Sequence, residues 1–335
     1  MLSASRATLC AVCALCTPGL LLLSHNLTLS FSPAKGTYDP RTWQTCQVFT
    51  SLIDWYADNA RALPWRDEGT SPWAILVCEV MSQQTPVSRV IPAWQAWLER
   101  WGTPEELEGA STAEVLLAWN RLGYPRRALR LRDCATEICE KHSGQVPRTR
   151  EELLALPGIG EYTADAILTF AYHRHCTLLD TNIRRVLARL QGYAYPPPSP
   201  RKSEREYAAS LVPSDDESAS QWNGAIMELG SLVCTASKPR CEQCPLASWC
   251  SWLEQGKPEN VQRKGSQGYK GTHREARGKI MRVLRDASQE SSGAVTLTSL
   301  RELSGLAEER FSPALSSLLN DSLVEKTSKG YRLPH

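Results

Sequence analysis

The sequence predicts a mainly α-helical protein that ends in a small module of helices and a hairpin. Apolar residues recur at helical spacing through most of residues 37–253, and no convincing alternating strand pattern occurs before residue 290. Four cysteines are also grouped within residues 234–250. The chain has 335 residues, of which 42% are hydrophobic. It is therefore long enough for two or three domains, and the composition excludes wholesale disorder.

The predicted helices follow one another along the body of the chain, separated by prolines and polar turns. Pro64 ends the first helix, and Pro86 and Pro92 are expected to divide the second helical stretch into two helices. The run PPPSP at 196–200 is predicted to be a loop. The helical stretches are 41–63, 71–101, 104–122, 126–141, 149–156, 162–173, 182–190, 203–211 and 218–233.

The C-terminal part has a different pattern. Residues 254–271 contain several glycines and basic residues, which predicts a flexible basic linker. Helical patterns follow at 272–287, 297–304 and 307–321, and residues 324–334 alternate around a Ser-Lys-Gly turn, as in a hairpin. Three helices and a hairpin suggest a winged-helix-like module over residues 272–335.

Residues 1–36 are predicted to be a leader of uncertain structure. The stretch from residue 7 to 23 is apolar and contains Cys10, Cys13 and Cys16, but no fourth ligand lies nearby. It resembles a short signal-peptide core or an unstructured leader, and it is too short and too interrupted for a confident membrane span.

The second cysteine group has the spacing of a ligand set. Cys234, Cys241, Cys244 and Cys250 follow C-x6-C-x2-C-x5-C, so four thiolates within 17 residues can wrap one ion or cluster. Twelve cysteines in the whole chain are too sparse for a small disulfide scaffold. Tetrahedral zinc and a [4Fe–4S] cluster both take four thiolates, and the spacing alone leaves both open.

The segment LPGIGEYTADAIL, Leu156–Leu168, is predicted to be a helix, a glycine-rich turn and a second helix. Gly158 and Gly160 permit positive φ, so that bare N–H groups at the start of the second helix could meet a DNA phosphate. The alternative is an ordinary helix–helix turn. Asp180 lies twenty residues past Gly160 and opens a helix, where an aspartate can also act simply as a cap.

The net charge of +2 conceals basic strips at 121–132, 184–189 and 257–285. The strips predict contacts with a phosphate backbone.

In combination, the helix-hairpin-helix, Asp180 and the cysteine loop resemble the helix-hairpin-helix DNA glycosylase superfamily over residues 40–252. Three segments, LPWR (63–66), EVMSQQT (79–85) and WNGAIMELG (222–230), resemble its adenine glycosylase (MutY) family. The resemblance implies a two-lobed helix-hairpin-helix glycosylase fold with an iron–sulfur loop, and it favours a [4Fe–4S] cluster over zinc.

The resemblance also assigns catalytic roles. Glu79 would be the general acid that protonates adenine, and Asp180 would stabilise the oxocarbenium-like sugar. Tyr162 stands where the endonuclease III type has its Schiff-base lysine, so a monofunctional glycosylase is expected. Apolar neighbours of Glu79 favour its protonated form, and polar neighbours of Asp180 favour the ionised form, as expected for an acid and a counter-charge.

Contacts with DNA are expected from residues of the segments that carry the resemblance, from the glycine-rich turn at 158–160 and from the residues around Tyr124. Gln84 and Tyr124 would wedge into the duplex, Leu122 would touch the opposite base, and Glu228 would help to hold adenine. The full predicted binding set is Trp65, Arg66, Gln84, Thr85, Leu122, Tyr124, Gly158, Gly160, Asn182 and Glu228.

The resulting hypothesis is excision of adenine opposite 8-oxoguanine or guanine in double-stranded DNA, by a monomer in the cytoplasm or nucleoid and not at a membrane. The residues after the cysteine loop are too few for the Nudix-like domain that many adenine glycosylases carry, which leaves the strength of 8-oxoguanine preference open. The alternatives are a thymine/uracil mismatch glycosylase of the same superfamily and a non-catalytic iron–sulfur DNA-binding regulator.

Overall fold

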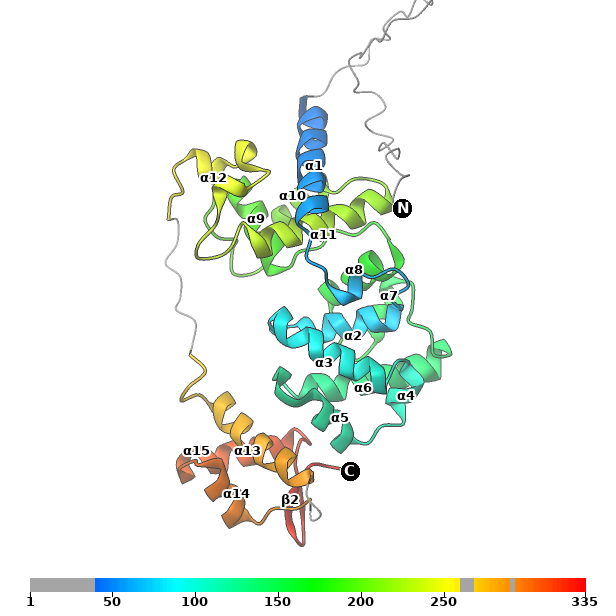
Figure 1. Ribbon diagram of the computed structural model, residues 1–335, viewed down its shortest axis with the longest axis vertical. Helices are drawn as coiled ribbons and strands as arrows, with labels where there is room; N and C mark the ends of the chain where they lie inside the picture. Colours follow the sequence, from blue (N-terminus) through cyan, green and yellow to red (C-terminus); the bar gives the residue numbers. More distant parts are fainter. Residues whose placement is uncertain (1–39, 260–267, 290–292) are drawn as a thin grey trace, which may run out of the picture. The chain divides into compact units, whose positions relative to one another are not determined.

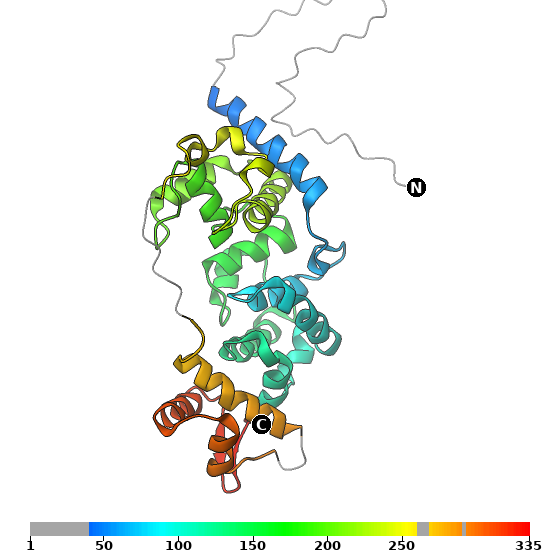
Figure 2. The same cartoon turned by 60° about the vertical axis from the view of Figure 1, so that its left-hand side comes forward.

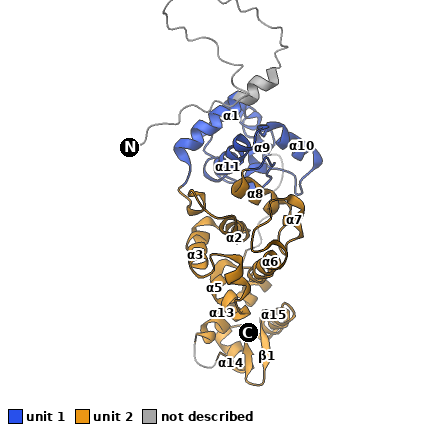
Figure 3. Cartoon of the chain, turned by 90° about the vertical axis from the view of Figure 1, so that its right-hand side faces the viewer, with its two compact units in different colours: residues 1–61, 174–261 blue, residues 62–173, 262–335 orange. Residues whose placement is uncertain are grey.

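The computed structural model describes residues 40–259, 268–289 and 293–335 (Figure 1). The predicted leader at 1–36 and residues 260–267 of the predicted linker lie outside this part. Contacts divide the chain into two compact units, with residues 1–61 and 174–261 in unit 1 and residues 62–173 and 262–335 in unit 2 (Figure 3). The expected glycosylase domain, 37–253, is thus shared by both units, and the C-terminal module belongs to unit 2.

Unit 1 is built on helices that bury one another's apolar faces. Its helices are α1 (Pro40–Asn59), α9 (Thr181–Leu190), α10 (Lys202–Leu211), α11 (Asp216–Leu232) and the short α12 (Ser251–Glu254). Helix α11 packs against α1 and α9, and α12 packs against α9. Leu52, Trp222 and Ile226 are almost completely buried in this core. The cysteine loop, with 3-10 turns η4 (Cys241–Gln243) and η5 (Ala247–Trp249), leads from α11 to α12.

Unit 2 is centred on α2 (Pro72–Ser82), which packs against α3, α6 and α8. Trp97 makes edge-to-face contacts with Trp101 and Trp119, whose ring centroids lie 4.7 and 5.6 Å from its own. The remaining elements before the C-terminal module are η2 (Pro64–Arg66), α3 (Val87–Arg100), α4 (Pro104–Glu108), α5 (Thr112–Trp119), η3 (Asn120–Leu122), α6 (Arg126–His142), α7 (Arg150–Ala155) and α8 (Glu161–Tyr172).

The helix predictions of unit 2 are wrong at two points. Pro86 divides the second helical stretch as predicted, since it is the N-cap of α3, but Pro92 lies inside α3 and does not end it. The helix expected over 104–122 is divided, because Ser111 begins α5 with a capping box and Asn120 ends it at φ 42°. Local cap chemistry therefore outweighed the continuous apolar periodicity of this stretch.

The C-terminal module contains the expected elements (Figure 2). Its buried cluster also includes residues of the rest of unit 2. The elements are α13 (His273–Ser288), α14 (Leu297–Ser304), α15 (Glu308–Asn320) and strands β1 (Glu325–Thr327) and β2 (Gly330–Arg332). The strands pair antiparallel with Lys326 opposite Tyr331, and Val295 forms a further bridge to Tyr331. Leu116 of α5 joins the buried cluster of this module.

Among the described residues, helices with the length and apolarity needed to cross a bilayer are absent.

Candidate functional site

The cysteines of residues 234–250 line one pocket in unit 1, together with Arg189 and Trp252. All four are free thiols. Burial raises the pKa of the Cys244 thiol to about 12, and repulsion from the other three sulfurs adds to this rise. Four sulfurs that repel one another as thiolates suit a positively charged metal group. In the described part of the chain, no three His, Cys, Asp or Glu side chains lie in a geometry that could hold a metal ion. The fit of these four cysteines to a metal group therefore rests on the pocket that they share and on their four sulfur donors.

Arginines of α9 hold the cysteine loop from one side. Arg189 donates to the Cys234 sulfur at 3.1 Å and to the Thr235 carbonyl at 2.9 Å, and its guanidinium lies 4.5 Å from the centre of the Trp252 ring. Arg184 forms a buried ion pair with Glu204 at 2.7 Å. The strip at 184–189 was predicted to contact DNA, but these side chains point into unit 1 and the prediction is wrong for them.

Asp180 is the N-cap of α9. Its Oδ1 accepts from the Ile183 N–H at 2.6 Å, and its Oδ2 accepts from the Asn182 side chain at 2.9 Å. Burial raises the pKa of Asp180, against the lowering effect of these hydrogen bonds and of the Arg185 charge. The polar neighbours lower the pKa as predicted, but desolvation is the largest influence and the net shift is upward, opposite to the predicted preference for the ionised form.

Helix α11 approaches this cap very closely at Gly230. A Cβ at Gly230 would lie 2.7 Å from the Asn182 Cβ and 2.9 Å from its carbonyl oxygen. Arg185 closes the arrangement, because it donates to the Asn182 side chain, the Gly230 carbonyl and the Cys234 carbonyl, each at 2.7 Å. The turn that carries Asp180 is thereby joined to the first residue of the cysteine loop.

Glu228 of α11 is completely buried and pairs with Arg61. The Arg61 guanidinium donates to both carboxylate oxygens, at 2.7 and 2.8 Å, and the Arg61 backbone N–H donates to one of them at 2.9 Å. These bonds link the end of α1 to α11. The contact of Glu228 with adenine gains no support from this geometry and stays a prediction.

Glu79 and Tyr162 lie in unit 2. Glu79 is half-buried on α2, between the buried residues Cys78 and Val80. Tyr162 is half-buried in the first turn of α8. Trp65 packs edge-to-face on Trp94 at 5.7 Å, and the side chain of Arg66 is exposed.

The turn between α7 and α8 has the predicted helix-hairpin-helix form. Gly158 has φ 82°, and a Cβ there would lie 3.1 Å from the Arg130 Cβ, so glycine is required on both grounds. Gly160 has φ −103°, so the expectation of positive φ is wrong at this position. Both glycines are exposed at the N-terminus of α8, where its first N–H groups are open to an anion.

Two loops of unit 2 hold residues in the left-handed region of the backbone. Gln84 has φ 55° and Tyr124 has φ 46°, and both side chains are exposed. By contrast, Thr85 and Leu122 are buried, and the Thr85 hydroxyl lies 3.2 Å from the Leu122 carbonyl. Gln84 and Tyr124 are thus presented outward from a pair of joined loops.

Arg127 is the side chain that fastens these loops together. It donates to the carbonyls of Val80 and Gln83, each at 2.7 Å, and to that of Gly123 at 3.1 Å. Burial lowers its pKa to about 10, so the guanidinium remains charged at neutral pH. Arg127 was predicted to contact phosphate, and its inward hydrogen bonds correct that prediction.

Comparison with known proteins decides the family. Residues 77–213 match the HhH-GPD superfamily of base excision DNA repair proteins, and residues 234–250 match the iron–sulfur binding domain of endonuclease III. An adenine DNA glycosylase of Mycolicibacterium smegmatis is 47% identical over 83% of this chain and 93% of its own length. The chain belongs to the adenine DNA glycosylase family.

Other matches of this glycosylase are more distant. A thymine/uracil-DNA glycosylase of Pyrobaculum aerophilum is 36% identical over 62% of this chain and 92% of its own length. A structure of endonuclease III in a non-covalent complex with DNA has a TM-score of 0.56 at 22% identity, over 64% of this chain and 98% of that one. The structural likeness confirms the predicted helix-hairpin-helix fold, and the loop match confirms iron–sulfur over zinc at the four cysteines.

Sequence reasoning missed Gly230 and Arg61, and it assigned Arg127 to phosphate in place of its role in joining two loops. Gly230 permits the close approach of α11 to Asn182, Arg61 neutralises Glu228, and Arg127 joins the loops of Gln84 and Tyr124. For Gly230, its place at the end of the WNGAIMELG motif was a usable signal. The partners of Arg61 and Arg127 are 167 and up to 47 residues away, so spacing gave no sign of either.

Proposed function

We propose that the protein is a monofunctional DNA N-glycosylase that releases adenine mispaired with 8-oxoguanine or guanine in double-stranded DNA. The observation that carries the proposal is Glu79 in the EVMSQQT segment. It is a half-buried carboxyl on a helix whose neighbouring residues are buried. A proton donor must be held in a fixed position, and a buried helix supplies such a position.

In the proposed reaction, Glu79 gives its proton to a ring nitrogen of the extruded adenine. The bond between the base and C1′ then breaks, and its electron pair leaves with the base. Positive charge develops on the sugar, and the Asp180 carboxylate stabilises it. Water adds at C1′ and gives a proton to the Glu79 carboxylate, which leaves free adenine, an abasic site and Glu79 in its starting form.

The hydrogen bonds to Asp180 support this role. The Ile183 N–H and the Asn182 side chain both donate to the carboxylate, which favours the ionised form against the effect of burial. Tyr162 has no amine with which to form a Schiff base, so the abasic product is expected to stay uncut.

Cys234, Cys241, Cys244 and Cys250 would hold the iron–sulfur cluster, which would cross-link the loop when bound. The Cys234 carbonyl accepts from Arg185, and Arg185 also donates to the Asn182 side chain beside Asp180. The chain's own residues thus transmit order from the loop to the carboxylate.

Extrusion of the base is assigned to Gln84 and Tyr124. Both are exposed, both have positive φ, and their loops are fastened by Arg127. A wedge that is fixed before binding avoids part of the ordering cost of opening the duplex.

The test is a panel of duplexes with A:8-oxoG, A:G, T:G and A:T pairs, incubated with the cluster-loaded protein and then with alkali. We expect strand breaks at A in the first two duplexes only, and loss of these breaks in Glu79→Gln with unchanged visible absorption of the cluster. Absence of any break at A would refute the proposal.

The second candidate is a thymine/uracil mismatch glycosylase, which the relative of Pyrobaculum aerophilum favours. Release of thymine from T:G with no release of adenine would establish it. Binding of mismatched duplex without release of any base, unaffected by Glu79→Gln and Asp180→Asn, would instead indicate a non-catalytic regulator.

We also infer that the protein is a monomer and that it acts where the chromosomal DNA lies, in the cytoplasm or nucleoid. Size-exclusion chromatography would test the first inference and cell fractionation the second.

A further inference from the structure

The C-terminal module lies against the loop that carries Tyr124. Arg274 of α13 donates to the Tyr124 hydroxyl at 2.5 Å, and its guanidinium lies 5.5 Å from the centre of the Tyr124 ring. The same guanidinium lies 5.2 Å from the centre of the Tyr269 ring. Both tyrosines are exposed, at 41% and 52% of their surfaces. Two aromatic rings and a cation therefore form one continuous surface of unit 2.

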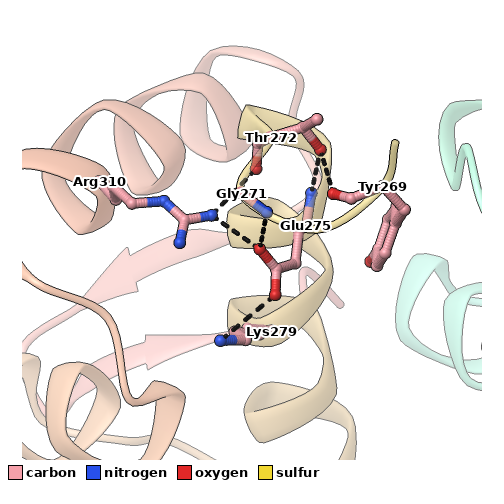
Figure 4. Close-up of polar contacts among 6 residues, drawn as sticks. All are labelled: Tyr269, Gly271, Thr272, Glu275, Lys279 and Arg310. Carbon is pink, nitrogen blue, oxygen red and sulfur yellow. Dashed lines mark hydrogen bonds and ion pairs between the residues drawn. The ribbon is translucent and has the colours of Figure 1, made fainter. Parts of the chain in front are cut away.

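Tyr269 reaches this surface because α13 is anchored at its first turn (Figure 4). Glu275 accepts from Arg310 at 2.9 Å and from the Gly271 N–H at 2.7 Å, and Thr272 caps the helix. Figure 4 shows the Tyr269 ring pointing away from this cap, on the side opposite Arg310. Gly278 leaves room for the ring, since a Cβ there would lie 2.6 Å from the Tyr269 hydroxyl.

Cations continue along the same face of α13. Arg274, Arg282 and Arg285 fall within one sector of the helix, at steps of eight and three residues. Burial lowers the pKa of Arg285, and the charges of Arg121 of η3 and of Arg282 lower it further, against the raising effect of the neighbouring Asp286. Among the ion pairs of the described residues, none includes these four arginines, although Arg277 and Lys279 on the same helix are paired with Asp321 and Glu275.

A cluster of unpaired cations that repel one another is costly unless an anion accompanies it. Planar guanidinium groups suit the oxygens of phosphodiesters, and aromatic rings beside them suit the sugar and base faces of nucleic acid. The charge and chemistry of this surface therefore fit the backbone of duplex DNA.

The parts of the module that a winged-helix protein usually turns to DNA have a different character here. Helix α15 begins with Glu308 and Glu309, and its Arg310 is committed to Glu275 and to the Thr272 carbonyl. An acidic first turn of this kind repels phosphate. The hairpin presents only Lys326 and Lys329 as exposed cations, because Arg332 is paired with Glu325.

We propose that Arg121 together with Arg274, Arg282 and Arg285 of α13 forms a phosphate-binding surface that grips the duplex beside the Tyr124 loop. The inference rests on the proposed function for its partner, duplex DNA. It assigns to α13 the DNA contact of the C-terminal module, which neither α15 nor the hairpin makes.

The experiment compares full-length, cluster-loaded variants on an unmodified duplex, with fluorescence anisotropy at a series of salt concentrations. Each lost phosphate contact lowers the slope of log K against log salt by about 0.9. Arg282→Gln/Arg285→Gln should therefore lower the slope by about 1.8. Between about 50 and about 200 mM salt, wild-type affinity then falls about twelvefold more than that of the variant.

Lys326→Gln/Lys329→Gln is the matched control, since it removes the same charge from the same module. We expect its slope to equal that of the wild type. Arg282→Lys/Arg285→Lys should restore the slope, because it keeps the charge, and thermal unfolding verifies the fold of each variant. Arg121→Gln should lower the slope by a further ~0.9 when added to the α13 variant.

An unchanged slope in Arg282→Gln/Arg285→Gln overturns the inference, as does an equal loss in the hairpin control. Neither result depends on base release. Failure of the proposed function would appear separately, as intact adenine in every duplex of the mismatch panel despite normal binding of DNA by the wild type.

Discussion

Replacement of Arg127 by lysine tests whether the loops of Gln84 and Tyr124 must be held in advance. Its two terminal nitrogens together reach the carbonyls of Val80 and Gln83 at the end of α2 and those of Leu122 and Gly123 before Tyr124. A lysine ammonium is a single point and cannot span both loops in this way. Arg127→Lys therefore keeps the charge and removes the bridge.

The magnitude follows from the backbone. A non-glycine residue in the left-handed region costs about 1–2 kcal/mol, so Gln84 and Tyr124 together hold about 2–4 kcal/mol of strain. If the loops relax in the variant, roughly half of this must be supplied again when the base is extruded. A loss of about 1–2 kcal/mol lowers the rate of excision about fivefold to thirtyfold.

The assay is single-turnover release of adenine, with 2-aminopurine fluorescence beside the mispair to follow extrusion. Both rates should fall together in Arg127→Lys, whereas Arg126→Lys should match the wild type because its exposed side chain can still pair with Asp321. If Arg127→Lys unfolds at the wild-type temperature and also extrudes and excises the base at wild-type rates, the bridge made by Arg127 is unnecessary.

Three further outcomes are expected. Gly230→Ala should lower excision about tenfold or more while the visible absorption of the cluster persists, because the new Cβ would meet Asn182 at 2.7 Å; full activity would contradict the close packing. Glu228→Gln should destabilise the protein by about 2–4 kcal/mol in thermal unfolding, since it breaks a buried ion pair, with Glu204→Gln as a comparison. The pKa of Glu275 is lowered to about 2, chiefly by its hydrogen bond with Arg310. Its contribution to folding stability is therefore present above the pKa of about 4.3 that a glutamate has in the unfolded chain, and it is lost as the pH falls toward 2. Thermal unfolding at pH values from 6 to 2 should show this loss in the wild type, and Glu275→Gln should show less of it.

The sequence predicted the local features of the molecule well. The helix-hairpin-helix at residues 156–168, the cysteine loop and the order of the C-terminal helices all depend on neighbours a few residues apart. Glycine, proline and cap residues act over the same range, so a short window contains their physical causes. The family itself followed from the combination of these local features.

Whether a charged side chain faces solvent or the protein interior could not be predicted from a short stretch of sequence. Arg184 and Arg189 are charged residues in a basic strip, yet both are buried, because Arg184 pairs with Glu204 of α10 and the cysteine loop covers Arg189. Composition gives the charge of a strip and does not tell whether solvent or protein surrounds it. The ion pair of Glu228 with Arg61 depends on packing of α1 against α11, which no short window contains.

The arginines that hydrogen-bond within the protein and those proposed to bind DNA differ in their acceptors. This difference distinguishes a structural arginine from one that is available to bind phosphate. Arg127 and Arg185 each direct short hydrogen bonds to backbone carbonyls, at the C-terminal ends of α2 and α11 and in the segments that follow them. Five donors in a planar group allow one arginine to satisfy several carbonyls at once, which lysine cannot do. A carbonyl offers only a partial negative charge, so the guanidinium orders a loop without the strong pairing of a carboxylate. Arg282 and Arg285 have neither kind of acceptor among the hydrogen bonds and ion pairs of the described residues. The sequence does not distinguish these two sets of arginines. Their acceptors assign one set to holding segments of the protein together, and the absence of such acceptors within the described part of the chain supports the proposal that the other set grips phosphate.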